Sequence, residues 1–196
     1  MKNTVIKSTI LASSLFFSNA IFANNETQYS DQLKHWSIGI GSYAFVIAND
    51  NDYDDDYYDD GDYVFSGLSL SAAYAFNNHF QIRGTYFSLE EDDLNNLESK
   101  GYDLMAYGGV GFAKKGFRGY GGAGLFSDEW SIKNAGYSSE VSFSGFQVGG
   151  GLGYNWGPVA LDFVLTLRKA DEYEDEFTQS GTYIAMSGNL SVSYLF

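Results

Sequence analysis

The stretch that decides the fold lies at the end of the chain, where residues 184–196 read IAMSGNLSVSYLF. Every second residue from Ile184 to Phe196 is apolar or glycine, and the residues between them, from Ala185 to Ser193, are small or polar. A period of two places alternate side chains on opposite faces of a β-strand. The stretch therefore predicts a strand whose two faces meet different surroundings.

The same alternation recurs toward the N-terminus, most clearly in residues 159–168, which read VALDFVLTLR. The first repeat is the least regular, because Tyr43, Phe45 and Ile47 fall out of step with the apolar residues before them, and we expect a β-bulge there. In total the pattern predicts strands at residues 36–47, 64–76, 80–89, 101–112, 117–127, 141–154, 159–168 and 182–196.

The connections between these strands alternate between short turns and long polar segments. The short turns lie at residues 77–79, 113–116 and 155–158. The long segments lie at residues 48–63, 90–100, 128–140 and 169–181. Antiparallel strands joined in this way have all short turns at one end and all long loops at the other. The predicted fold class is therefore all-β, an eight-stranded antiparallel up-and-down barrel.

Acidic residues are concentrated in the long segments. The chain has 25 Asp and Glu against 11 Lys and Arg, with a formal net charge of −14. The long segments hold 21 of the acidic residues, and only Asp103 and Asp162 lie in predicted strands. The negative balance argues against a nucleic-acid partner, which needs Lys and Arg patches. The absence of Cys excludes disulfide scaffolds, thiol catalysis and cysteine–zinc sites.

The N-terminal residues have the pattern of a secretory signal peptide. Lys2 and Lys7 precede an uncharged apolar stretch, and Ala20 and Ala23 are small residues suited to a cleavage site. We expect residues 1–23 to be the signal peptide, 24–35 a periplasmic N-terminal segment and 36–196 the barrel domain. A secreted chain without Cys suggests the envelope of a Gram-negative bacterium.

The polarity of the two strand faces leaves two kinds of barrel to consider. A soluble binding barrel is apolar inside, whereas a transmembrane barrel is apolar outside and polar inside. Aromatic residues gather beside the short turns, as in the aromatic girdle of a membrane barrel. We therefore favour a transmembrane barrel, with a soluble periplasmic binding barrel as an alternative. The predicted girdle residues are Tyr74, Phe76, Phe80, Phe112, Phe117, Tyr154 and Trp156.

Three segments resemble a known family. Residues 80–86 (FQIRGTY), 145–154 (GFQVGGGLGY) and 190–196 (LSVSYLF) look like the small OmpA/OmpX/opacity-type outer-membrane β-barrels. The resemblance implies a place in the cell outer membrane, in contact with lipid and lipopolysaccharide. Tyr194 and the terminal Phe196 resemble the C-terminal signal that the barrel-assembly machinery reads. We expect a monomer.

The less apolar strand face predicts a polar network inside the barrel. Eight strands leave room for little more than side chains, so a wide pore is excluded. Charges enclosed there must form ion pairs, because an unpaired buried charge is costly. A packed polar plug and a narrow conduit with exchanging ion pairs both fit this pattern. The candidate network residues are Arg83, Asp103, Arg118, Asp162 and Arg168.

Catalytic and metal-binding patterns are weak. The histidines, His35 and His79, both map to the short-turn end, so no Ser-His-acid set faces the loops, and we predict no enzyme activity. One acidic segment resembles the start of a calcium loop, but Asp55 and Gly61 replace the Gly and Glu that an EF-hand requires. We expect no cofactor beyond weakly bound Ca²⁺ or Mg²⁺, with candidate ligands Asp50, Asp52, Asp54 and Asp56.

These observations favour a structural or surface-interaction role for a barrel that displays four acidic extracellular loops. The first alternative is a narrow, porin-like channel that favours cations, since a rim of carboxylates concentrates them. The second alternative is the soluble binding barrel. The sequence names no surface ligand.

Overall fold

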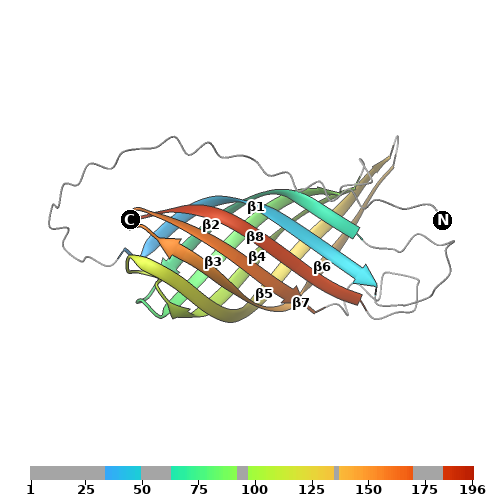
Figure 1. Ribbon diagram of the computed structural model, residues 1–196. Helices are drawn as coiled ribbons and strands as arrows, with labels where there is room; N and C mark the ends of the chain where they lie inside the picture. The colour runs from blue at the N-terminus through green and yellow to red at the C-terminus, as the bar shows by residue number, and fades with distance from the viewer. Residues whose placement is uncertain (1–33, 50–62, 92–96, 135–136, 170–182) are drawn as a thin grey trace, which may run out of the picture. The chain divides into compact units, whose positions relative to one another are not determined.

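The computed structural model describes residues 34–49, 63–91, 97–134, 137–169 and 183–196, and these residues form eight strands (Figure 1). No helix among them has the length and apolar composition needed to cross a membrane. The strands are β1 (Trp36–Asn49), β2 (Tyr63–Ala75), β3 (Phe80–Glu91), β4 (Leu97–Val110), β5 (Gly116–Asn134), β6 (Tyr137–Asn155), β7 (Val159–Arg168) and β8 (Tyr183–Leu195).

The strands form a closed antiparallel barrel. Each strand pairs with the next, and β1 pairs with β8 from Ser37 opposite Leu195 to Asn49 opposite Tyr183. Figure 1 shows β1 and β8 running side by side. The predicted eight-stranded antiparallel fold is confirmed. We call the end with the connections at 76–79, 111–115 and 156–158 the turn end, and the opposite end the loop end.

The first strand has no bulge, so that prediction is wrong. Its register with both neighbours is continuous through Tyr43, Phe45 and Ile47. These three side chains face inward and are at most 2% exposed. The alternation never breaks; instead, the inward face of β1 changes from small residues near the turn end to large apolar ones near the loop end.

The hairpin of β5 and β6 is longer than predicted. Residues 128–134 and 137–140 extend the two strands, so most of the expected long segment at 128–140 is paired sheet. The inward alternation continues there, with Asp128 and Trp130 buried and Glu129 and Glu140 exposed. Acidic side chains on the outward face made this stretch look like a loop, although the inward face is that of a strand.

The outward face of the barrel is apolar. Leu68, Phe146 and Ile40 are 76%, 71% and 69% exposed, and large apolar side chains stand outward on every strand. Most of the predicted girdle residues lie outward beside the turns, but Phe112 does not. It is 1% exposed and lies inside, with its ring centroid 5.2 Å from that of Tyr120. Its turn folds inward, so the outward alternation of β4 ends at Val110.

The interior holds two apolar clusters with polar groups between and around them. The loop-end cluster comprises Tyr43, Phe45, Ile47, Phe65, Phe87, Leu89, Leu97, Phe126, Trp130, Phe143 and Ala185. The turn-end cluster comprises Ala75, Met105, Tyr107, Phe112, Ala113, Tyr120 and Val164. The interior is therefore less uniformly polar than the sequence pattern predicted.

Inward glycines make room for these large side chains. A Cβ atom at Gly151 would lie 2.7 Å from the ring of Tyr120, whereas a Cβ atom at the outward Gly84 would have no atom within 4 Å. A barrel of eight strands has too little space for a side chain opposite each ring.

Gly151→Ala should therefore lower the free energy of unfolding by about 1–3 kcal/mol, because it overpacks the interior against Tyr120. Gly84→Ala is the matched control and should leave the stability equal or slightly higher, since glycine is unfavourable within strands. Urea unfolding of the refolded barrel in lipid vesicles measures both. Equal effects of the two substitutions would contradict this account of the interior.

Candidate functional site

Arg168, the last residue of β7, is the centre of the first of two charged networks inside the barrel. Its Nη2 donates to Asp103 Oδ1 at 3.0 Å and to the Tyr43 hydroxyl at 2.9 Å. Its Nη1 lies 3.4 Å from Asp128 Oδ2. One guanidinium group thus joins carboxylates from β4 and β5 to the hydroxyl of Tyr43 on β1. We call Arg168, Asp103, Asp128, Tyr43 and Gln147 the Arg168 network.

Aromatic rings enclose the same guanidinium. Its Cζ atom lies 4.5 Å from the ring centroid of Phe45, 4.6 Å from that of Phe126 and 5.3 Å from that of Phe87. A cation held over ring faces away from water gains about 2 kcal/mol or more. The apolar residues of the loop-end cluster therefore stabilise the charge of Arg168 as well as packing around it.

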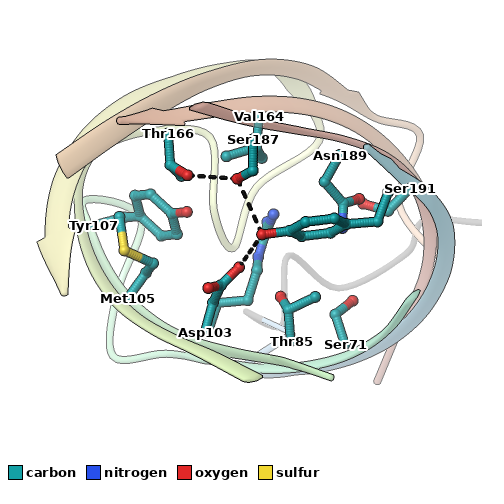
Figure 2. Close-up of a pocket in the computed structure, with 12 residues that line it drawn as sticks. Ser71, Thr85, Asp103, Met105, Tyr107, Val164, Thr166, Ser187, Asn189 and Ser191 are labelled. Atoms are coloured by element: carbon teal, nitrogen blue, oxygen red, sulfur yellow. Dashed lines mark hydrogen bonds between the residues drawn. The ribbon is translucent and has the colours of Figure 1, made fainter. Parts of the chain in front are cut away.

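Asp103 is held from several sides. The Tyr43 hydroxyl donates to its Oδ2 at 2.6 Å, and Gln147 Nε2 donates to its Oδ1 at 3.0 Å. Tyr43 also lies 3.0 Å from Ser187 Oγ, which lies 2.6 Å from Thr166 Oγ1 (Figure 2). The hydrogen bonds extend across the barrel from β4 to β7 and β8.

Asp162 on β7 is the centre of the second network, which lies nearer the turn end. Arg118 Nη1 donates to its Oδ2 at 2.7 Å, and the Tyr120 hydroxyl donates to its Oδ1 at 2.9 Å. Arg83 Nη2 lies farther away, at 3.5 Å from Oδ2. Asp162 and Arg118 are 0% and 1% exposed. We call Asp162, Arg83, Arg118 and Tyr120 the Asp162 network.

Arg118 also ties this network to the turn between β4 and β5. Its Nε donates to Gly111 O and its Nη2 to Phe112 O, both at 3.1 Å. The turn itself is held from the neighbouring connection, where Asn78 Oδ1 accepts from Lys114 N at 3.2 Å. Phe112 therefore lies buried at the turn end of the barrel, and hydrogen bonds from the buried Arg118 fix the turn that carries it.

The structure places all five predicted network residues inside the barrel, but in two networks rather than one. The sequence analysis did not include Asp128 in the network, because it assigned this residue to a polar loop. It also missed the role of Tyr43, which it placed at a β-bulge. The period-two spacing of Phe126, Asp128 and Trp130 was the available signal for Asp128. Nothing in the sequence indicates which arginine meets which aspartate.

The structure describes only part of the other predicted sites, namely the candidate metal ligands and the candidate assembly signal. Asp50, Asp52, Asp54 and Asp56 lie outside the described residues, so their metal binding stays a prediction. Within the described ranges, no three His, Asp or Glu side chains gather closely enough to hold a metal ion. Tyr194 and Phe196 stand outward, 55% and 60% exposed, with ring centroids 6.2 Å apart. Their role as an assembly signal also stays a prediction.

Comparison with solved structures defines the class of fold. The chain is similar to Ail, the attachment invasion locus protein of Yersinia pestis, with 20% identity over 84% of this chain and 100% of that one and a TM-score of 0.55. Ail has also been solved in complex with the heparin analogue sucrose octasulfate. Neisserial surface protein A is similar at 17% identity over 82% and 97% of the chains, with a TM-score of 0.56.

The N-terminal β-barrel domain of Pseudomonas aeruginosa OprF matches at 17% identity over 84% and 100% of the chains, with a TM-score of 0.52. No protein-family model matches the sequence, and no curated protein matches it. The chain thus has the fold of the small eight-stranded outer-membrane barrels. At these identities the likeness concerns the fold alone.

Arg168→Met should lower the free energy of unfolding by about 3–5 kcal/mol, because it leaves Asp103 and Asp128 buried without their shared cation. Adding Asp128→Asn should restore part of the loss. Lys100→Met is the control, since Lys100 forms an exposed pair with Glu98 at 3.1 Å and its loss should leave stability unchanged. Urea unfolding in vesicles measures the series, and a fully stable Arg168→Met variant would refute the role of this network.

Proposed function

We propose that this protein is an integral outer-membrane barrel with a closed interior and a surface-interaction role at its acidic loop end. The observation that carries the proposal is the inverted polarity of the barrel. Apolar side chains cover the outside, while two ionic networks are enclosed inside. Lipid tails require an apolar outer face, and a membrane barrel accepts polar groups in its interior.

The apolar outer face weighs against the soluble binding barrel. Such a barrel needs a polar outer surface and an apolar cavity for its ligand. Here Leu165, Leu167 and Phe163 on β7 are 47%, 50% and 48% exposed, while Asp162 and Arg168 on the opposite face of that strand are buried. The turn-end aromatics on the outward face, such as Phe80 and Trp156, suit a membrane interface.

The filled interior weighs against the channel. An ion crossing the barrel would have to pass the loop-end cluster, in which Phe45, Phe65 and Phe87 are 0% exposed. It would then meet Phe112 and Arg118 at the turn end. Moving an ion past tightly packed apolar side chains is costly, so the packing supports a plugged scaffold.

The loop end is acidic, and this sets the chemistry of the partner that we propose. Glu90 and Glu98 are direct neighbours on the outward faces of β3 and β4, and Lys100 faces Glu129 on β5. The segments at 50–62 and 170–182 add eight and five acidic residues in the sequence. Ail accepts a polyanion, whereas a surface of this charge repels one and attracts cationic segments of a partner protein.

Leu165→Arg should destabilise the barrel in lipid by about 2–4 kcal/mol, because it places a charge on the lipid-facing side of β7. Ser142→Arg is the control, since Ser142 is exposed near the loop end of β6, opposite Glu129, and the substitution should have little effect. Unfolding in vesicles compares them. Equal stability of the two variants, or a wild-type barrel that stays in solution without detergent, would contradict a membrane location.

A barrel in nanodiscs should bind poly-lysine, and the binding should weaken as salt rises, because it rests on charge. Replacing Asp54, Asp55 and Asp56 with asparagine should reduce the binding, whereas heparin should bind no better than to empty nanodiscs. Surface plasmon resonance measures the binding of poly-lysine and of heparin to nanodiscs with the barrel and to empty nanodiscs. Heparin binding, or poly-lysine binding equal to that of empty nanodiscs, would exclude the cationic partner while leaving the membrane location untouched.

A further inference from the structure

The turn between β4 and β5 carries exposed positive charge at the turn end of the barrel. Lys114 and Lys115 are exposed there, and neither forms an ion pair within the part of the chain that the structure describes. The turns at 76–79 and 156–158 contain no Lys or Arg. Among the described residues, the exposed acidic side chains all lie toward the loop end, so nothing described at the turn end neutralises these two lysines.

The same turn is held in one shape by its neighbours. Asn78 Oδ1 accepts hydrogen bonds from the backbone N–H groups of Ala113 and Lys114 at 3.4 and 3.2 Å. Gly111 and Gly116 lie at either end of the turn with φ of +89° and +130°, a conformation that favours glycine. A backbone fixed in this way loses little conformational freedom when a partner binds to it.

An outward aromatic surface lies beside the two lysines. Phe117, which is 61% exposed, pairs with Tyr154 across β5 and β6. The ring of Tyr154 lies 5.0 Å from that of Trp156 between centroids. Aromatic side chains of membrane proteins lie at the depth of the lipid headgroups. The lysines of the adjoining turn therefore lie at the bilayer surface, where their long flexible side chains reach the phosphates.

We infer that Lys114 and Lys115 form a binding site for the headgroups of anionic phospholipids in the leaflet at the turn end. A zwitterionic headgroup carries its own cation beside its phosphate, whereas an anionic headgroup has a net charge for the lysines to neutralise. Each lysine near an anionic lipid surface strengthens association about fivefold. The inference rests on the proposed membrane location, and it concerns the end of the barrel opposite the proposed surface interaction.

The net charge of the whole protein predicts the opposite preference. A formal charge of −14 should exclude anionic lipid from the barrel surface. The acidic loop end, however, is separated from the turn end by strands of 10 to 19 residues. A strand rises about 3.3 Å per residue, and charges are screened over about 10 Å at 0.1 M salt. The local charge of the β4–β5 turn therefore decides which lipid gathers beside it.

Trp156 is a natural reporter of this site, because the residue before it, Asn155, pairs with Gly116 at the start of β5. Trp36→Phe removes the other outward tryptophan, and Trp130 is buried inside the barrel. The full barrel with this substitution is refolded in phosphatidylcholine vesicles. Quenching of Trp156 fluorescence by acyl-brominated phosphatidylglycerol is then compared with quenching by acyl-brominated phosphatidylcholine at the same mole fraction.

The quenching curves should give a relative association constant that favours phosphatidylglycerol by about fivefold or more at low salt. Lys114→Gln combined with Lys115→Gln should bring this ratio to about one. The double arginine variant at the same positions should keep the preference, because it keeps the charge. Lys100→Gln is the matched control, since Lys100 is an exposed lysine near the loop end and its loss should leave the ratio unchanged.

Equal quenching by the two lipids, or a preference that survives the double glutamine substitution, would overturn the inference. A preference abolished by millimolar glycerol phosphate in solution would also overturn it, because the site would then take a soluble phosphate rather than a lipid. Quenching by neither lipid would contradict the proposed membrane location, and the inference with it. Strong quenching by both lipids to the same extent would leave that location intact and refute the lipid preference alone.

Discussion

The structure depends on the closure of β1 onto β8, because this pairing turns eight strands into a closed barrel. Once the sheet is closed, every strand has a neighbour on each side, although residues 137–146 of β6 extend past β7 and pair with β5 alone, and every second side chain in the closed part must point into a narrow interior. A large inward side chain on one strand then requires a small residue at the neighbouring position of the next strand. Glycine at 151 opposite the ring of Tyr120 shows this matching at a single position.

Enclosure also explains why the charged residues form networks rather than isolated pairs. Asp162 receives three groups from β3 and β5, and Arg168 donates to β4, β5 and β1. Each buried charge thus has several partners from different strands, which a low-dielectric interior requires. The same contacts connect strands that are not neighbours in the sheet, so the networks stiffen the barrel across its diameter.

The sequence predicted the strands well because alternation depends only on which face of each strand is apolar. The unbroken pattern of β7 is by itself enough to assign Asp162 and Arg168 to the inward face. Prediction from alternation fails where the inward side chains change from small to large and apolar, as at Phe45 and Ile47. It also fails where acidic residues lie on the outward face near the loop end, as at Glu129. The pairing of Arg168 with Asp128 depends on barrel register, which no local pattern contains.

The closing pair of strands also has a kinetic consequence. The first strand of the barrel hydrogen-bonds to the last, so Ser37 meets Leu195 across nearly the whole barrel sequence. This contact joins the two ends of the barrel sequence, so it can form only when the strands between them are brought into place. Folding dominated by such distant contacts is slow. Until β8 arrives, β1 has an exposed edge and an apolar face, so the unfinished chain needs protection from aggregation.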